Sequence, residues 1–280
     1  MIFIFFQKVL PKHFLSRLLG RLAHSRCRVF KNWTIKIFIK YFEIDLSEAV
    51  VTEIDHFPSF NDFFIRKLKP EVRPIPNDPK IIAAPADGII SQMGQIQKGN
   101  LLQAKNHLYS LEELLGGDIE TSRLFQNGQF CTIYLSPKDY HRVHMPISGK
   151  LEKMIYVPGK LFSVNHKSVK GIPRLFNQNE RVICLFETAA GPMTMIFVGA
   201  MLVGGIVTQW SGKVLPAKVS FPVEQANTLV FLNQGEEAGF FQWGSTVILL
   251  FGEQQIEWRA DLNSGARIKV GERIGLLNNL

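Results

Sequence analysis

The sequence has few cysteines and lacks the common metal and nucleotide motifs. Its cysteines, Cys27, Cys131 and Cys184, are three isolated residues that form no CxxC pair. A disulfide framework and a cysteine-ligated metal are therefore disfavoured, and a reducing compartment is the default. There is also no glycine-rich phosphate loop and no regular alternation of strands and helices, which disfavours a Rossmann or P-loop enzyme.

No apolar run in the sequence is long enough to cross a bilayer as one helix, which takes about 20 residues. Polar residues and proline interrupt the N-terminal run early, and this start lacks the charged n-region and the cleavage site of a signal peptide. Glycine and proline also divide the longer run over residues 189–207. This run therefore predicts two buried strands joined by a turn.

Acidic residues are absent from residues 1–40, which hold nine of the 32 lysines and arginines. The formal net charge of +8 therefore belongs to this N-terminal segment, and it predicts an anionic partner for that segment alone. Large apolar residues are interleaved with the basic ones, and over residues 14–22 they fall on one side of a helix. This pattern favours an anionic membrane surface over nucleic acid. The alternative is a helix packed on the core with its arginines in water.

The sequence pattern changes near residue 56. Before it the apolar spacing is helical, and after a connector rich in proline and asparagine the segments are short and rich in β-branched and aromatic residues. One short helix is predicted at residues 110–117. Strands are predicted at residues 81–91, 130–135, 182–186, 193–201, 202–209, 246–251 and 266–270. We expect an α+β protein with a mainly antiparallel β core over residues 57–280 and a helical membrane-docking region over residues 1–56.

Two turn-like motifs contain candidate catalytic side chains. In PADGIIS, Asp87 lies within an apolar segment, where it could act in chemistry or only cap the turn. In YLSPKDYHRVHMP, His141 and His144 would share a face if residues 138–144 formed a helical turn. The two histidines could be structural, or one of them could activate a serine that an aspartate helps to orient.

The histidine pair could also be half of a metal site. Asp87, His107 or His166 would have to complete it, and no HExxH motif surrounds the pair. A metal-dependent phospholipid hydrolase that uses the two histidines and Asp87 is therefore an alternative function. A second alternative is a catalytically silent membrane-docking module in which these residues are structural.

The motif FQWGSTVILLF contains the serine that nucleophilic chemistry would need. Ser245 comes directly before an unbroken apolar run, and Gly244 allows a strained backbone that opens the peptide bond to attack. The motif is not the GxSxG elbow of an α/β-hydrolase. From these residues alone we expect an Asp/His/Ser set in a β-rich protein with affinity for membranes.

Several long motifs in one order give the sequence a family resemblance. It resembles the phosphatidylserine decarboxylases of the bacterial, membrane-associated type over nearly its whole length. The motifs are FNDFFIRKLKPEVRPI, PADGIISQMG, YLSPKDYHRVHMP, VPGKLFSVNH, NERVICLFET and WGSTVILLF. The usual family tetrapeptide is Leu-Gly-Ser-Thr, and Trp243 stands here in place of its leucine.

The resemblance implies a proenzyme that cuts itself between Gly244 and Ser245. The products would be a larger chain, residues 1–244, and a smaller chain, residues 245–280. The resemblance also implies that Ser245 becomes an N-terminal pyruvoyl group, the covalent cofactor, and that neither a metal nor pyridoxal phosphate is used. This carbonyl would form a Schiff base with phosphatidylserine, and decarboxylation would give phosphatidylethanolamine.

The resemblance also assigns roles to individual residues. His144, oriented by Asp87, would take the hydroxyl proton of Ser245, which then attacks the preceding carbonyl. His141 would assist decarboxylation or protonation, and His166 would belong to the substrate pocket. The protein is expected to be peripheral on the cytoplasmic face of the bacterial inner membrane, and a homodimer is compatible with the resemblance.

Overall fold

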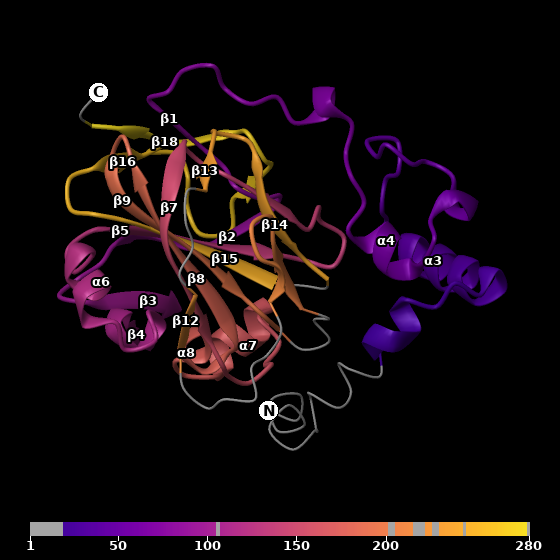
Figure 1. Cartoon of the computed structure of the whole chain (residues 1–280), viewed down its shortest axis with the longest axis horizontal. Helices are drawn as coiled ribbons and strands as arrows, with labels where there is room; N and C mark the ends of the chain where they lie inside the picture. The colour runs from indigo at the N-terminus through magenta and orange to yellow at the C-terminus, as the bar shows by residue number, and fades with distance from the viewer. Residues whose placement is uncertain are drawn as a thin grey trace.

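Antiparallel strands form the centre of the molecule (Figure 1). The computed structural model describes residues 19–104, 107–200, 205–214, 222–225, 230–242 and 245–278. Its largest sheet has nine strands. In spatial order they are β12 (Val223–Gln225), β7 (Gly149–Val157), β8 (Arg181–Thr188), β9 (Gly191–Val198), β15 (Ser245–Phe251), β5 (Gln129–Leu135), β2 (Gly88–Gln95) and β17 (Arg267–Ile268), with β13 (Phe231–Leu232) beside β7.

The strand β15 lies inside this sheet and has no exposed residue. It pairs with β5 on one side and with β9 on the other. Val247 and Leu249 contribute to one hydrophobic core, and Ile248 and Leu250 contribute to the other. Successive residues of a strand point to opposite faces, so a strand buried on both faces is apolar at nearly every position.

Smaller sheets and short helices surround the large sheet. One face of the large sheet, the one that carries Ile248 and Leu250, is covered by helices. The smaller sheets are β11 (Gly212–Val214) with β10 (Ile206–Thr208), β14 (Glu237–Phe241) and β6 (Arg142–His144); β1 (Ile81–Ala83) with β18 (Arg273–Leu277) and β16 (Ile256–Trp258); and β3 (Asn100–Ala104) with β4 (His107–Ser110). The helices are α5 (Leu111–Leu114), α6 (Ile119–Leu124), α7 (His166–Gly171) and α8 (Leu175–Gln178).

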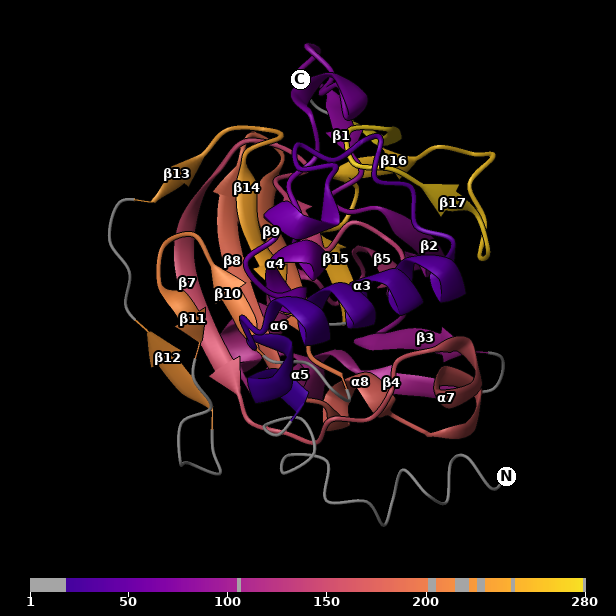
Figure 2. The ribbon, with the colours of Figure 1, turned by 90° about the vertical axis from the view of Figure 1, so that its right-hand side faces the viewer.

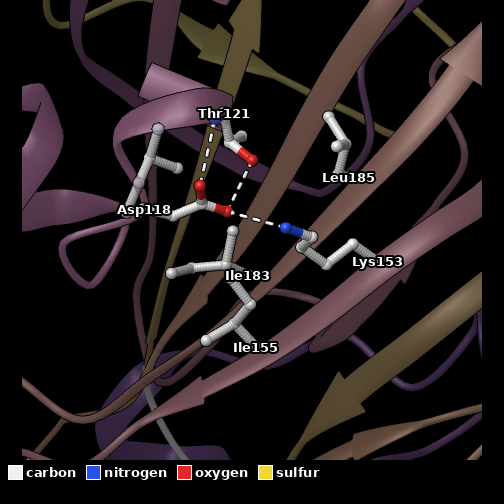
Figure 3. Close-up of a pocket in the computed structure, with 7 residues that line it drawn as sticks. Asp118, Thr121, Lys153, Ile155, Ile183 and Leu185 are labelled. Carbon is white, nitrogen blue, oxygen red and sulfur yellow. Dashed lines mark hydrogen bonds and ion pairs between the residues drawn. The ribbon is translucent and has the colours of Figure 1, made fainter. Parts of the chain in front are cut away.

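Asp118 fastens α6 to the large sheet (Figure 3). Its carboxylate accepts hydrogen bonds from the backbone N–H of Thr121 at 3.1 Å and from the Thr121 hydroxyl at 2.6 Å. Lys153 of β7 donates to the same carboxylate at 3.1 Å. One side chain therefore caps the helix and pairs with the strand beneath it.

The N-terminal part consists of helices that lie to the right of the large sheet in Figure 1 and in front of it in Figure 2. Its elements are α3 (Arg28–Phe42), η1 (Ile54–His56), α4 (Phe60–Phe64) and η2 (Pro70–Val72), and residues 19–23 are also helical. An aromatic cluster joins α3 to α4, with Phe38 ring centroids 5.1 Å from Phe60 and 6.1 Å from Phe63. This cluster forms a hydrophobic core separate from the two cores of the sheet.

Lys31 fixes α3 to the segment that follows it. Only 4% of this residue is exposed, and its ammonium group donates to the carbonyl oxygens of Ile54, Asp55 and Phe57 at 3.2, 3.1 and 2.6 Å. The buried charge is thus hydrogen-bonded at each of its three N–H groups, as a buried lysine requires.

The predicted fold class is confirmed, because the structure is α+β with mainly antiparallel sheets and N-terminal helices. The run at 189–207 forms β9 and β10 and not one helix, although residues 201–204 lie outside the described residues. The predicted strand at 81–91 is divided into β1 and β2 at the turn that contains Pro85 and Asp87.

The helical turn considered for residues 138–144 does not form. Residues 142–144 are instead β6, which pairs with β14. The boundary between residues 56 and 57 stays a prediction; Phe57 and Phe60, just after it, belong to the core that contains Ile35 of α3. Residues 14–18 of the predicted amphipathic helix lie outside the described residues. Among the helices that the structure describes, none has the length and apolarity of a membrane span.

Candidate functional site

One end of the large sheet brings most of the predicted site residues together. In the pairing register, Ile89 of β2 lies opposite Tyr134 of β5, which lies opposite Thr246 of β15. Adjacent strands are about 4.8 Å apart, so the start of β2 and the start of β15 are separated by about 10 Å. Asp87 precedes β2 and Ser245 is the first residue of β15. The two residues therefore flank the end of β5.

Ser245 is fully buried at this end of the sheet. Its hydroxyl oxygen has no hydrogen-bond partner in the part of the chain that the structure describes. An unpaired buried hydroxyl costs about 1–3 kcal/mol; Thr132, Thr194 and Thr246 share this feature, and what distinguishes Ser245 is its position at the end of the sheet. Trp243 and Gly244 lie outside the described residues, so the bond predicted to be cut is described only on its serine side.

His141 is fully buried beside the end of β5. Its Nε2 lies 3.0 Å from the carbonyl oxygen of Ser136, and its ring stacks on Phe64 with the centroids 4.2 Å apart. A carbonyl oxygen only accepts, so the proton is assigned to Nε2, and the Nδ1 lone pair has no partner among the described residues. Burial, together with the positive charge of Arg66, lowers the pKa of His141 to about 3. His141 is therefore a neutral base.

His144 is held as the opposite tautomer. Its Nδ1 lies 2.8 Å from the carbonyl oxygen of Gly235, which assigns the proton to Nδ1. The hydroxyl of Tyr140 lies 3.3 Å from the other nitrogen, Nε2. Burial lowers the pKa of His144, so this ring is also neutral and presents a lone pair at Nε2. The carbonyl of Gly235 thus fixes the tautomer of His144.

Asp87 is buried and makes its hydrogen bonds away from the histidines. Arg73 donates to its two oxygens, from Nε at 2.9 Å and from Nη2 at 2.5 Å, and the backbone N–H of Val270 donates at 2.8 Å. Arg73 also donates to Glu48 at 2.8 Å. The backbone N–H of His144 donates to the carbonyl of Pro85, which brings this strand beside the Asp87 turn. Burial lowers the pKa of His144, and this is opposed by the carbonyl of Gly235, by the charge of Glu237 and, to a smaller extent, by the charge of Asp87.

Three residues of this region were not predicted as site residues. Arg73 pairs with Asp87, Arg66 contacts the loop before His141, and Tyr140 contacts His144. The dense basic residues of FIRKLKPEVRPI were the signal for the two arginines, but only the folded chain shows their partners.

A cavity of about 160 Å³ lies beside Asp87 and is lined by charged residues of both signs. Asp139 and Lys269 also line it. Asp139 accepts hydrogen bonds from the N–H and the hydroxyl of Ser136 at 2.7 and 2.6 Å, and burial raises its pKa. The cavity therefore adjoins the loop that positions His141.

His166 does not join the other predicted residues. It is exposed at the start of α7, where Asn165 caps the helix, and among the described residues it makes no hydrogen bond to Asp87, His141, His144 or Ser245. Nor do the residues that the structure describes include a group of three His, Cys, Asp or Glu placed to hold a metal ion.

The end of the sheet thus holds a buried hydroxyl, two neutral histidines and an ionic pair. The family model described as phosphatidylserine decarboxylase matches residues 60–276, and a second, described as PSD, matches residues 2–43. The chain therefore belongs to the phosphatidylserine decarboxylase family, and it is an enzyme of the decarboxylase class.

Similar proteins cover almost the whole chain. A Pseudomonas putida protein is 47% identical over 277 residues, 98% of this chain and 96% of its own. A Pseudomonas fluorescens protein is 47% identical over 279 residues, covering 98% and 97% of the two chains, and a Stutzerimonas stutzeri protein is 48% identical over 278 residues, covering 98% and 94%. Each is named phosphatidylserine decarboxylase proenzyme.

Proposed function

We propose that this protein converts phosphatidylserine into phosphatidylethanolamine with a pyruvoyl group made from its own Ser245. The observation that carries the proposal is the buried, unpaired hydroxyl of Ser245 at the end of the sheet where His141 and His144 are held as neutral bases. Membership of a family whose members are named proenzymes supports it. No ligand from outside the chain is needed to form this group.

Self-cleavage begins at the hydroxyl of Ser245. Its oxygen attacks the carbonyl carbon of Gly244, the C–N bond breaks, and an ester forms in its place. His144 accepts the hydroxyl proton at Nε2 and returns it to the released nitrogen. Because Tyr140 contacts that nitrogen, its hydroxyl must swing away or pass the proton along.

The ester is then opened by elimination. A base removes the α-proton of residue 245 as its Cβ–O bond breaks, which leaves a carboxylate on Gly244 and a Cα=Cβ double bond in the former serine; a proton later adds to Cβ to form the methyl group. Water then replaces the nitrogen, ammonia leaves, and the pyruvoyl group becomes the N-terminus of the smaller chain, residues 245–280. The larger chain is residues 1–244.

Asp87 contributes a negative charge to this step. Its carboxylate is held in place by Arg73 and by the N–H of Val270. A fixed negative charge near His144 stabilises the imidazolium that forms when the ring takes the proton. Asp87 therefore acts by orienting the field around His144 and not through a direct hydrogen bond to it.

The second reaction is the loss of carbon dioxide from the lipid headgroup. The pyruvoyl group would supply the electron sink that this loss requires. His141 has an unpaired lone pair at Nδ1, so it can accept a proton from the substrate amine and return a proton to carbon after carbon dioxide has left. His166, exposed at the start of α7, is proposed as a residue of the substrate pocket.

The substrate is brought to the site at an anionic membrane surface. On α3 the exposed apolar residues Val29, Trp33, Ile37 and Tyr41 are spaced four apart, with exposed fractions of 81, 61, 47 and 78%. A row at this spacing forms one stripe along a helix. Exposed lysines lie on the same helix, which suits a peripheral contact with the cytoplasmic face of the inner membrane.

An apolar cavity adjoins this stripe. It measures about 310 Å³ and is lined by residues of α3, α4 and the preceding helical turn, among them Leu22, Trp33 and Phe60. A membrane surface would cover it and remove its apolar walls from water. The proposed contact would thus bury both the stripe and the cavity against lipid.

Intact mass spectrometry of the purified, active protein tests the proposal. We expect two chains that correspond to residues 1–244 and 245–280, the smaller one lighter by one ammonia molecule than a chain that begins with serine. Ser245→Ala should give one full-length chain without decarboxylase activity. Thr194→Val is the matched control, because this hydroxyl is also buried and unpaired but lies in the middle of β9. A single full-length mass from active protein would overturn the proposal.

A further inference from the structure

Arg66 places a buried positive charge next to the candidate site. Only 7% of the residue is exposed. Its Nη2 donates to the carbonyl oxygen of Lys138 at 3.1 Å, and the guanidinium lies 5.6 Å from the ring centroid of Phe63. The N–H groups at Nε and Nη1 have no hydrogen-bond partner within the part of the chain that the structure describes.

The carboxylates around Arg66 are already paired with other groups. Asp87 and Glu48 both accept from Arg73, and Asp139 accepts from the amide and hydroxyl of a serine. A buried guanidinium with two unpartnered nitrogens is unfavourable unless an anion pairs with it. Burial lowers the pKa of Arg66, as expected for a charge without a close partner. An anion from outside the chain is therefore the natural partner.

Arg66 lies between the membrane-facing helices and the reactive end of the sheet. It follows α4, whose Phe64 stacks on His141, and the carbonyl of Ile65 accepts from Arg142 at 2.9 Å. In a phospholipid the phosphodiester lies between the acyl chains and the amine. A substrate with its chains at the helices and its amine at Ser245 would therefore carry its phosphate past Arg66.

We propose that Arg66 binds the phosphodiester of the phospholipid headgroup through one of its unpartnered nitrogens, Nε or Nη1. This inference rests on the proposed function and identifies one substrate contact of the same site. Nε–H and Nη1–H point to different sides of the guanidinium, so one phosphate oxygen accepts a charge-assisted hydrogen bond from either of them, while Nη2 stays on the carbonyl of Lys138. Because both nitrogens are covered in the lipid-free chain, the headgroup must displace part of that cover.

The substrate carboxylate is a poorer partner for Arg66. Decarboxylation removes the negative charge of that group, so a cation held against it stabilises the bound substrate more than the transition state. The phosphodiester keeps its charge throughout the reaction. A contact to it therefore improves binding without opposing the loss of carbon dioxide.

Steady-state kinetics of Arg66→Gln on phosphatidylserine in mixed micelles test the inference. We expect complete self-cleavage by intact mass, a KM raised about tenfold or more, and a much smaller change in kcat. The inhibition constant of the product phosphatidylethanolamine, which has the phosphodiester but no carboxylate, should rise by the same factor. Arg66→Lys should recover part of both. Arg123→Gln, an exposed arginine on α6, is the matched control and should change neither constant.

The same contact can be tested without a variant. A phosphatidylserine analogue whose phosphate is methylated to a neutral triester should show a similarly raised KM with the unchanged enzyme, which guards against a variant that fails to fold. Unchanged constants for both the variant and the analogue would make Arg66 structural and overturn the inference. A raised KM for phosphatidylserine with an unchanged constant for phosphatidylethanolamine would assign Arg66 to the carboxylate instead. Absence of cleavage in the unchanged protein would refute the proposed function separately.

Discussion

Mild acid should destabilise the folded protein through His141. Burial, and then the charge of Arg66, lower the pKa of this histidine from its ordinary 6.5 to about 3. At mildly acidic pH the unfolded chain therefore binds a proton at His141, whereas the folded chain does not. Above the pKa of the unfolded chain, the neutral state of His141 costs the folded protein no stability relative to the unfolded chain. As the pH falls from there toward the folded pKa, the free energy of unfolding decreases. Between about pH 7.5 and about pH 5 the loss amounts to about 2 kcal/mol.

A comparison of two chains isolates this effect from the other titrating groups. Ser245→Ala keeps the chain in one piece under the proposed function, and the second chain adds His141→Gln. Burial raises the pKa of Asp139 and of Glu180, which works in the opposite direction, and His144 works in the same direction as His141. These groups are present in both chains, so the difference between the two free energies of unfolding largely cancels them.

Urea unfolding at several pH values measures that difference. The advantage of the chain with His141 over the chain with glutamine should shrink by about 2 kcal/mol from about pH 7.5 to about pH 5. A difference that stays constant over this range would refute the argument. It would mean that water reaches the ring and that the histidine titrates normally in the folded protein.

Three further substitutions test contacts that hold the structure together. Arg73→Gln should lower the free energy of unfolding by about 3–5 kcal/mol, because it leaves the buried Asp87 without its charged partner. Urea unfolding measures this loss. Adding Asp87→Asn should restore part of it, because the unpaired charge is then removed. Lys31→Met should loosen the attachment of α3, because three carbonyl oxygens lose their donor, and limited proteolysis should cut this region faster than in the unchanged chain. Ile248→Ala in the buried β15 should lower the free energy of unfolding by about 2–5 kcal/mol. Val29→Ala on the exposed stripe should lower it by no more than about 0.5 kcal/mol. An equal loss at both sites would contradict the burial described for β15.

The sequence predicted the elements whose signal is local. The apolar run after Ser245 is one of them, because a strand buried on both faces leaves an unbroken apolar pattern. The glycines and the proline in residues 189–207 likewise predicted two strands correctly. Asp87 and Ser245 were found as candidates because each lies at a turn or a strand start that can be read from a few neighbouring residues.

Contacts between distant segments could not be predicted in this way. The tautomer of His144 is set by Gly235, which is 91 residues away, and Arg66 reaches a carbonyl 72 residues away. The HxxH spacing fitted a helical turn locally, but β14 offered hydrogen bonds that made residues 142–144 a strand instead. His141 lies just before this strand and His144 is its last residue, so the two histidines have different surroundings.

Under the proposed cleavage, the 245–280 piece would begin with β15, whose backbone is hydrogen-bonded on one side to β5 and on the other to β9. It would also carry β17 and β18, which pair with β2 and β1 of the other piece. Separating the two pieces would remove β15 from the interior of the large sheet and expose both hydrophobic cores to water. The cut protein should therefore behave as a permanent heterodimer, and neither piece, synthesised alone, should reach the native fold.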